Sequence, residues 1–192
     1  MSEQSERFER AADFFGSVVD QISDSQWDEP TPCDEWNVRG LLNHVVVEQL
    51  WAPLLLEGKT IADVGSTFDG DQLGSEPKEA WRESSLESRA WFGSPGAMER
   101  TVHLSYGDDS AVNYCDQMTV DALIHGWDLA RAIDADETLP RELVNWAYGA
   151  LLPMQELLIA SGVFGTPVEI PESADQQSKL LGLLGRQPAR DN

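Results

Sequence analysis

Apolar residues recur at helical spacing along most of the chain. In residues 5–24 large apolar side chains alternate at steps of four and three, which predicts an amphipathic helix. Residues 37–58 are apolar nearly all round, and Asn37 is a good N-cap, so a second helix is expected deep in the core. Pro53 should kink this helix or end its regular part.

Three more helices are predicted further along the chain. One opens near Pro77 and stops before Gly93. Another spans about 114–133, and a fifth runs over 138–161, where Pro153 predicts a kink and Gly162 a C-terminal cap.

The connecting segments carry few strand signals. Residues 59–74 are rich in glycine and aspartate and read as a surface loop, whereas 100–114 alternate weakly, as in a short strand pair or an irregular loop. A proline-bearing stretch then leads to a short helix ending at Gly185. The pattern predicts an all-α protein: one domain over 1–192, built as a bundle of four or five helices with a C-terminal extension over about 163–192.

The charge of the chain excludes several classes of partner. Thirteen Lys and Arg against 34 Asp and Glu give a formal net charge of −21, which repels phosphate backbones and anionic lipid. The chain also lacks an apolar run of about 20 residues, as a membrane span requires, and an N-terminal leader pattern. We therefore expect a cytoplasmic protein with a small-molecule substrate and no nucleic-acid or membrane partner. A homodimer is compatible with the sequence.

Cysteine and histidine are scarce, which narrows the candidate chemistry. Cys33 and Cys115 stand far apart and form no Cys-x-x-Cys pair, so neither a disulfide framework nor a zinc knuckle is expected. Any histidine chemistry must come from His44, His103 or His125.

The segment DALIHGWD places Asp121, His125 and Asp128 on one face of a helix. His44 likewise sits in apolar company on the second predicted helix. If both faces point inward, His44, Asp121 and His125 form two imidazoles and one carboxylate, the pattern of a catalytic metal site with open positions. Two plainer interpretations stand beside this one: core histidines satisfied by hydrogen bonds, or a helix-surface Asp–His pair.

Three segments carry a family resemblance. TPCDEWNVRGLLNHV (31–45), DALIHGWDLARA (121–132) and a tail from FGTPV (164–168) to LGR (184–186) resemble the DinB/YfiT-like metal-binding proteins. The similar branch is the actinobacterial one related to mycothiol-dependent maleylpyruvate isomerase. The resemblance implies an up-and-down four-helix bundle with a divalent metal near its open end. It also implies that His44, Asp121 and His125 are the ligands.

The chain departs from that pattern at Asp121, where the isomerase carries glutamate and other members carry histidine. Aspartate is one methylene shorter, so the metal position or its coordination is expected to differ. The difference at Asp121 argues against a shared substrate with the isomerase more than it argues against metal binding.

Further candidates surround these residues. Glu48 is either a fourth ligand, an acceptor for an imidazole N–H, or a solvated carboxylate at the bundle mouth. Asp128 is expected to orient His125 or to bond in the neighbourhood of Trp127, rather than to be a ligand itself. Arg131 is the candidate for binding carboxylates of a substrate or thiol cofactor, although a surface arginine near a helix C-terminus needs no such role. Cys33 is interpreted as a small buried residue rather than a nucleophile. His103 has no acid at recognisable spacing, which disfavours a Ser-His-Asp triad.

Two functions remain in view. The first is a metalloenzyme, a thiol-dependent transferase or isomerase in which the metal activates a low-molecular-weight thiol such as mycothiol, or a water. The second is a non-catalytic metal- or ligand-binding module with a stress or regulatory role. Two imidazoles and a carboxylate suit zinc first, with nickel or iron as alternatives.

Overall fold

A computed structural model describes residues 2–162 and 164–188 of the 192-residue chain. The chain divides into two compact units, Met1–Glu137 and Thr138–Asn192. That the whole chain behaves as one domain stays a prediction of the sequence.

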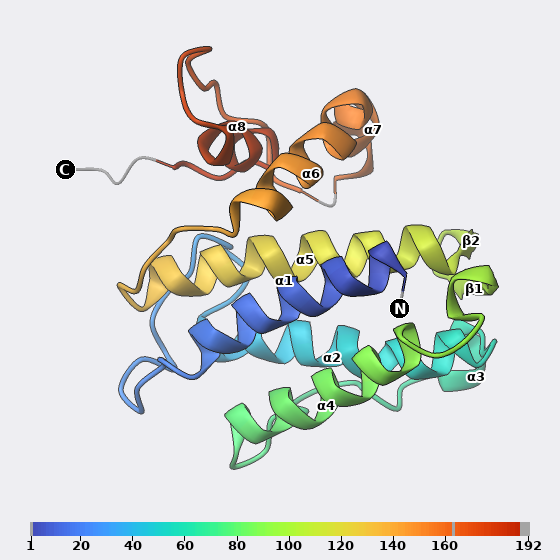
Figure 1. Ribbon diagram of the computed structural model, residues 1–192. Helices are drawn as coiled ribbons and strands as arrows, with labels where there is room; N and C mark the ends of the chain where they lie inside the picture. Colours follow the sequence, from blue (N-terminus) through green and yellow to red (C-terminus); the bar gives the residue numbers. More distant parts are fainter. Residues whose placement is uncertain (1, 163, 189–192) are drawn as a thin grey trace. The chain divides into compact units, whose positions relative to one another are not determined.

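The first unit is a helical bundle, as the hydrophobic pattern predicts (Figure 1). Its four long helices are α1 (Glu3–Val19), α2 (Val38–Leu56), α4 (Pro77–Phe92) and α5 (Ala111–Ala132). Helix α1 packs on α5 and α4, and α2 packs on the same two neighbours. Each helix therefore buries its apolar face against two others, which is how amphipathic helices form a common core.

Large apolar and aromatic side chains fill the bundle core. Phe8 stacks edge-on against Phe92 at 5.0 Å between ring centroids, and Phe15 lies 4.5 Å from Trp81. Phe8, Phe15, Phe92 and Trp127 are almost completely buried. Burial of one such side chain contributes about 2–3 kcal/mol relative to leaving it in water, so this core dominates the stability of the unit.

The long connection between α2 and α4 sets the direction of the bundle. Residues 57–76, which contain the one-turn helix α3 (Ile61–Val64), carry the chain back to the end where α2 began. At that end the Arg39 guanidinium donates to Asp71 Oδ2 and to the Gly74 carbonyl, each at 2.8 Å. The bundle is confirmed, but α2 and α4 run in the same direction, so strict up-and-down alternation does not extend to this pair.

A short hairpin precedes α5. Strand β1 (Thr101–Leu104) pairs antiparallel with β2 (Gly107–Ser110), which confirms the strand pair that the weak alternation suggested. Gly107 has a φ of 128°, a backbone conformation that favours glycine. Helix α5 starts at Ala111, earlier than periodicity predicts, because the Ser110 side chain accepts a hydrogen bond from the Asn113 N–H at 3.1 Å.

The end of one other helix differs from the sequence prediction for an identifiable reason. Helix α1 ends at Val19, whereas Ile22 extends the apolar stripe beyond it. The backbone continues there in tighter turns, with the Ile22 N–H bonded to the Val19 carbonyl at 3.2 Å. Ile22 therefore still reaches the core without being helical.

The second unit contains α6 (Arg141–Leu151), α7 (Gln155–Ser161) and α8 (Gln176–Leu183). A 3-10 turn, Leu152–Met154, separates α6 from α7 at Pro153, so the predicted kink is a full interruption. Gly162 follows α7 with a φ of 67°, as a C-cap glycine should. Helix α6 packs on α8. Among the described residues, no helix combines the length and the apolar content that a membrane span would need.

Candidate metal centre

Helices α2 and α5 bring three predicted residues together inside the first unit. Helix α2 begins where the Asn37 side chain accepts the Gly40 N–H at 2.8 Å, and His44 follows two turns later. Asp121 and His125 lie one turn apart on α5, facing α2. The placement confirms that the two histidine-bearing faces point toward each other.

The three side chains converge on one point. Asp121 Oδ1 lies 3.5 Å from His44 Nε2 and 3.4 Å from His125 Nε2. The two imidazole rings are 5.1 Å apart between centroids and nearly perpendicular. One donor atom from each residue lies within 4.8 Å of the others, a spacing that a single metal ion can bridge. His125 is 10% exposed, and His44 and Asp121 are each 26% exposed, so the cluster is largely screened but reachable.

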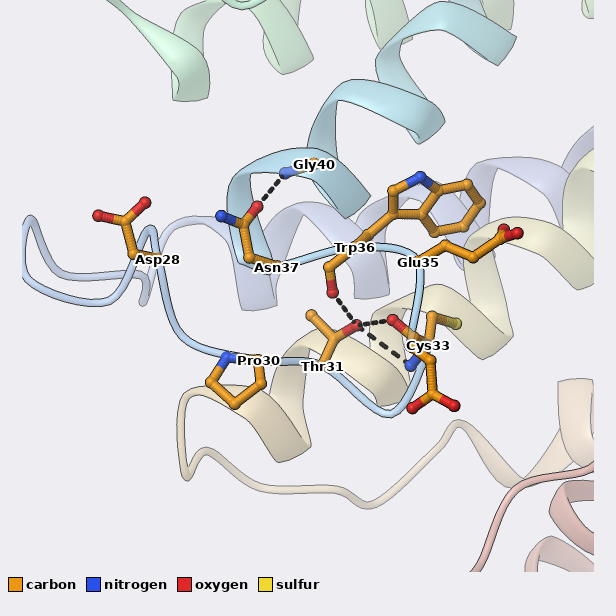
Figure 2. A pocket seen from close by; sticks show the side chains of 9 residues that line it. Asp28, Pro30, Thr31, Cys33, Glu35, Trp36, Asn37 and Gly40 are labelled. Atoms are coloured by element: carbon orange, nitrogen blue, oxygen red, sulfur yellow. Dashed lines mark hydrogen bonds between the residues drawn. The ribbon is translucent and has the colours of Figure 1, made fainter.

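Trp36 covers the two imidazoles from the loop before α2. Its ring stacks on His44 at 4.4 Å with an interplanar angle of 14°, and it meets His125 edge-on at 5.7 Å. Thr31 fixes this loop: its hydroxyl oxygen accepts the Cys33 N–H at 3.1 Å and donates to the Trp36 carbonyl at 2.8 Å (Figure 2). The TPCDEW segment thus supplies an aromatic wall held in place by its own hydrogen bonds.

The same loop lines an open pocket of about 480 Å³. Cys33, Glu35 and Trp36 contribute side chains to it, and Figure 2 shows them on the turn that leads into α2. Polar and aromatic groups in one concavity beside a cluster of donors are typical of a small-molecule site.

The cluster concentrates negative charge in a partly buried place. Burial and, after it, the charge of Asp121 raise the pKa of Glu48 to about 7, against the opposing effect of the His44 and His125 imidazoles. Burial alone would lower the pKa of His44, but the hydrogen bond and charge of Asp121, with Glu48 and Glu35, raise it above its ordinary value. The carboxylates of Asp121 and Glu48 lie near each other in a partly buried site. A bound cation is favoured there, because it offsets the repulsion between the two negative charges.

Asp128 and Cys33 complete the surroundings of His125. Asp128 is fully buried, and its Oδ2 lies 3.0 Å from His125 Nδ1 and 3.2 Å from Cys33 Sγ. The expectation that Asp128 sits against His125 is therefore confirmed as a contact. Cys33 is half-buried and lies in this cluster, a position that its place in the sequence did not suggest.

Tyr114 is a site residue that the sequence analysis missed. Its side chain is buried, and its hydroxyl has no hydrogen-bond partner among the described residues. Burial, with the charges of Glu48 and Asp121, raises its pKa well above the ordinary value. Helical spacing could have found it, because position 114 lies seven residues before Asp121 on the same face of α5.

Two other candidates are placed elsewhere. The Arg131 guanidinium pairs with Glu137 and lies over the Trp127 ring at 4.2 Å, and its position on α5 turns away from the face of Asp121 and His125. Its assignment to a thiol cofactor stays a prediction. His103 does have an acid partner: its Nδ1 lies 2.7 Å from Asp108 Oδ1 across the hairpin. Sequence spacing did not indicate this partner, because strand register creates the pair.

The first unit is similar to a known family of domains. A family model described as the mycothiol maleylpyruvate isomerase N-terminal domain matches residues 8–130, a range that contains all three converging residues. Two proteins of Mycobacterium tuberculosis, one from each of two strains and each described as an uncharacterized protein, are 30% identical over 139 residues. Each match covers 70% of this chain and 70% of the relative.

A solved structure has the same fold. The crystal structure of the mycothiol-dependent maleylpyruvate isomerase matches with a TM-score of 0.63, over 98% of this chain and 81% of that one. The identity is 14%, so this likeness concerns the fold alone. Family model and fold together confirm the resemblance seen in the sequence segments.

Proposed function

The chain belongs to the family of the mycothiol maleylpyruvate isomerase N-terminal domain, and from this premise we propose that it is a divalent-metal protein acting in thiol-dependent isomerisation or transfer on a small molecule. The observation that carries the proposal is the convergence of His44, Asp121 and His125 on one point between α2 and α5. Three donors from two rigid helices leave positions for a ligand, as catalytic rather than structural sites do.

The donor set fits the group that the family implies. Imidazole nitrogen and carboxylate oxygen are ligands of zinc, nickel and iron(II), and we propose zinc first. The partly buried carboxyl groups of Asp121 and Glu48 support a cation here, since each raises the cost of ionising the other. A divalent metal at this place would lower the pKa of a thiol or water and so supply a nucleophile near neutral pH.

The residues around the cluster have separate tasks in this proposal. His44, Asp121 and His125 hold the metal. Trp36 shields one side of the imidazoles from water and offers an aromatic surface to a ligand in the neighbouring pocket. The Tyr114 hydroxyl is available to donate a hydrogen bond to a group that enters the site. A thiol of the mycothiol type as co-substrate is supported by the structural neighbour, the mycothiol-dependent maleylpyruvate isomerase.

Elemental analysis of protein purified without tag or chelator tests the metal. We expect about one divalent metal per chain, lost in His44→Ala and in His125→Ala. His103→Ala is the matched control, because it removes an imidazole that already contacts an aspartate outside this cluster. No metal in the wild type, and no rise in melting temperature on adding zinc, nickel or iron(II), would refute the metal assignment.

Turnover separates an enzyme from a binding module. The metal-loaded protein should isomerise maleylpyruvate, or a related unsaturated acid, only when a low-molecular-weight thiol is supplied. Stoichiometric metal without turnover on any such acid and thiol would leave the non-catalytic module as the better account of the same site.

A further inference from the structure

The two nitrogens of His125 face different carboxylates. Nε2 lies 3.4 Å from Asp121 Oδ1, on the side of the three-residue cluster, whereas Nδ1 lies 3.0 Å from Asp128 Oδ2. Asp128 is 0% exposed. An ionised carboxylate only accepts hydrogen bonds, so each contact competes for the single proton of a neutral imidazole. The Asp128 contact is the shorter of the two, 3.0 against 3.4 Å, and therefore favours the proton on Nδ1. The lone pair is then left on Nε2, the atom that points at the cluster.

We infer that Asp128 is the positioning residue of this centre: it fixes the tautomer and the ring orientation of His125 so that Nε2 is presented as a ligand. The inference rests on the proposed function for its consequence, metal affinity, but its structural content concerns the protein's own atoms. Carboxylates that accept the distal N–H of a ligating histidine raise its basicity, and their loss typically weakens metal binding 10- to 100-fold.

Cys33 supports the same carboxylate from the opposite direction. Its thiol donates to Asp128 Oδ2 at 3.2 Å and lies farther, 3.9 Å, from His125 Nδ1. Thr31 holds the Cys33 backbone, so the thiol approaches Asp128 from a fixed loop. Asp128 Oδ2 is therefore held by contacts to both Cys33 and His125. A carboxylate fixed in this way can in turn fix the imidazole that it contacts. Cys33 acts here through Asp128 and not as a nucleophile.

The same three residues could instead bind a metal themselves. Cys33, His125 and Asp128 form the other donor group in the described part of the chain. In that arrangement His125 would use Nδ1 as ligand and could not donate from it. The contacts of 3.0 and 3.2 Å to Asp128 Oδ2 are ordinary hydrogen-bond distances, which favours the positioning role.

The tautomer of His125 tests the inference without metal. In ¹⁵N-labelled metal-free protein above pH 8, the His125 Nδ1 shift should be that of a protonated ring nitrogen and the Nε2 shift that of an unprotonated one. Asp128→Asn should move the ring toward the opposite tautomer. A wild-type His125 that carries its proton on Nε2 would overturn the inference, whatever the variant does.

Metal affinity tests the consequence. With zinc as the probe, Asp128→Asn should bind 10- to 100-fold more weakly, and Cys33→Ala only a few-fold more weakly. Asp116→Asn is the control, because Asp116 is also a carboxylate on α5 but pairs with Arg7, at 3.1 Å, away from the centre. Asp116→Asn should lower the stability of the protein and leave its zinc affinity unchanged. A loss of zinc affinity in this control as well would show that losing any carboxylate on α5 weakens binding.

The remaining outcomes separate the competing accounts. Wild-type affinity in Asp128→Asn, together with loss of zinc in His125→Ala, would overturn the positioning role and leave the proposed function intact. An intense near-ultraviolet thiolate band with cobalt(II), lost in Cys33→Ala, would assign the metal to the Cys33 group and overturn the inference. If the wild type binds no zinc, the proposed function fails, and the tautomer still decides the role of Asp128. Should Asp128→Asn not fold, the wild-type tautomer and the cobalt spectrum remain decisive.

Discussion

Histidine and aspartate meet at two places in the first unit, the hairpin and the α2–α5 cluster, and the two sites differ in everything except their residue types. In the hairpin, His103 Nδ1 lies 2.7 Å from Asp108 Oδ1, and the two side chains are 35% and 70% exposed. Between α2 and α5, Asp121 lies at the longer distances of 3.4 and 3.5 Å from His125 and His44. The shorter contact belongs to the simpler site. A short distance alone therefore does not mark a functional centre.

Burial and the number of converging donors make the difference. The hairpin pair follows from strand register, His103 opposite Asp108, and both side chains face water, which screens their charges. The α2–α5 cluster places two imidazoles and a carboxylate within reach of one ion and adds the half-buried Glu48 nearby. That arrangement carries a cost in the metal-free protein that a cation would offset. Natural sequences tolerate such costs mainly at functional sites.

The largest expected effect separates the two aspartates by metal binding. Asp121→Ala should weaken zinc binding about 100-fold or more, because it removes one of three proposed ligands, whereas Asp108→Ala should leave it unchanged. Competition of each purified variant with a chromophoric zinc chelator measures both constants. Equal affinities in the two variants would erase the distinction between the sites and move the metal, if bound, away from Asp121.

A smaller effect concerns Glu48 and pH. Its folded-state pKa of about 7 stands above its ordinary value of 4.5. A raised carboxyl pKa means that the folded state disfavours ionisation, so this group removes stability as pH rises from about 4.5 to 7. Glu48→Gln should abolish that loss. We expect the metal-free variant to gain about 3 kcal/mol over the wild type at pH 8 and nothing at pH 4.

Urea unfolding at several pH values measures this difference, with Glu83→Gln as the control from the exposed face of α4. Saturating zinc should shrink or reverse the gain at pH 8, since a cation stabilises the ionised form of Glu48. A gain of the same size at both pH values would show that the substitution acts through packing and not through charge.

Local patterns predicted much of this molecule from its sequence. The apolar periodicities place α1, α2, α4 and α5, and the spacing of Asp121 and His125 placed both on the face that meets His44. These features depend on neighbours three or four residues apart, where helical geometry dictates the outcome. The departures at Val19 and Pro153 are also local, and each follows from turn hydrogen bonds or from the missing proline N–H.

Features that depend on tertiary contact could not be read in the same way. Cys33 and Asp128 are 95 residues apart, and this spacing does not predict the contact between the thiol and the carboxylate. The parallel course of α2 and α4 depends on where the 57–76 connection returns the chain. The hydrogen bond from Arg39 to Asp71 marks that place, and it forms only in the folded structure. Tyr114 lies between these cases: its face was predictable, but its lack of a partner within the described residues was not.

The smallest expected effect is in the hairpin, and it tests the comparison from the other side. His103→Gln should change the free energy of unfolding by less than about 0.5 kcal/mol, because an exposed pair gains little over its separate hydration. Metal content should stay at the wild-type value, since His103 belongs to neither donor group found among the described residues. Thermal unfolding and elemental analysis of the same preparation measure both quantities. A loss of metal in this variant would mean that the hairpin reaches the centre, and exposure would then no longer distinguish the two sites.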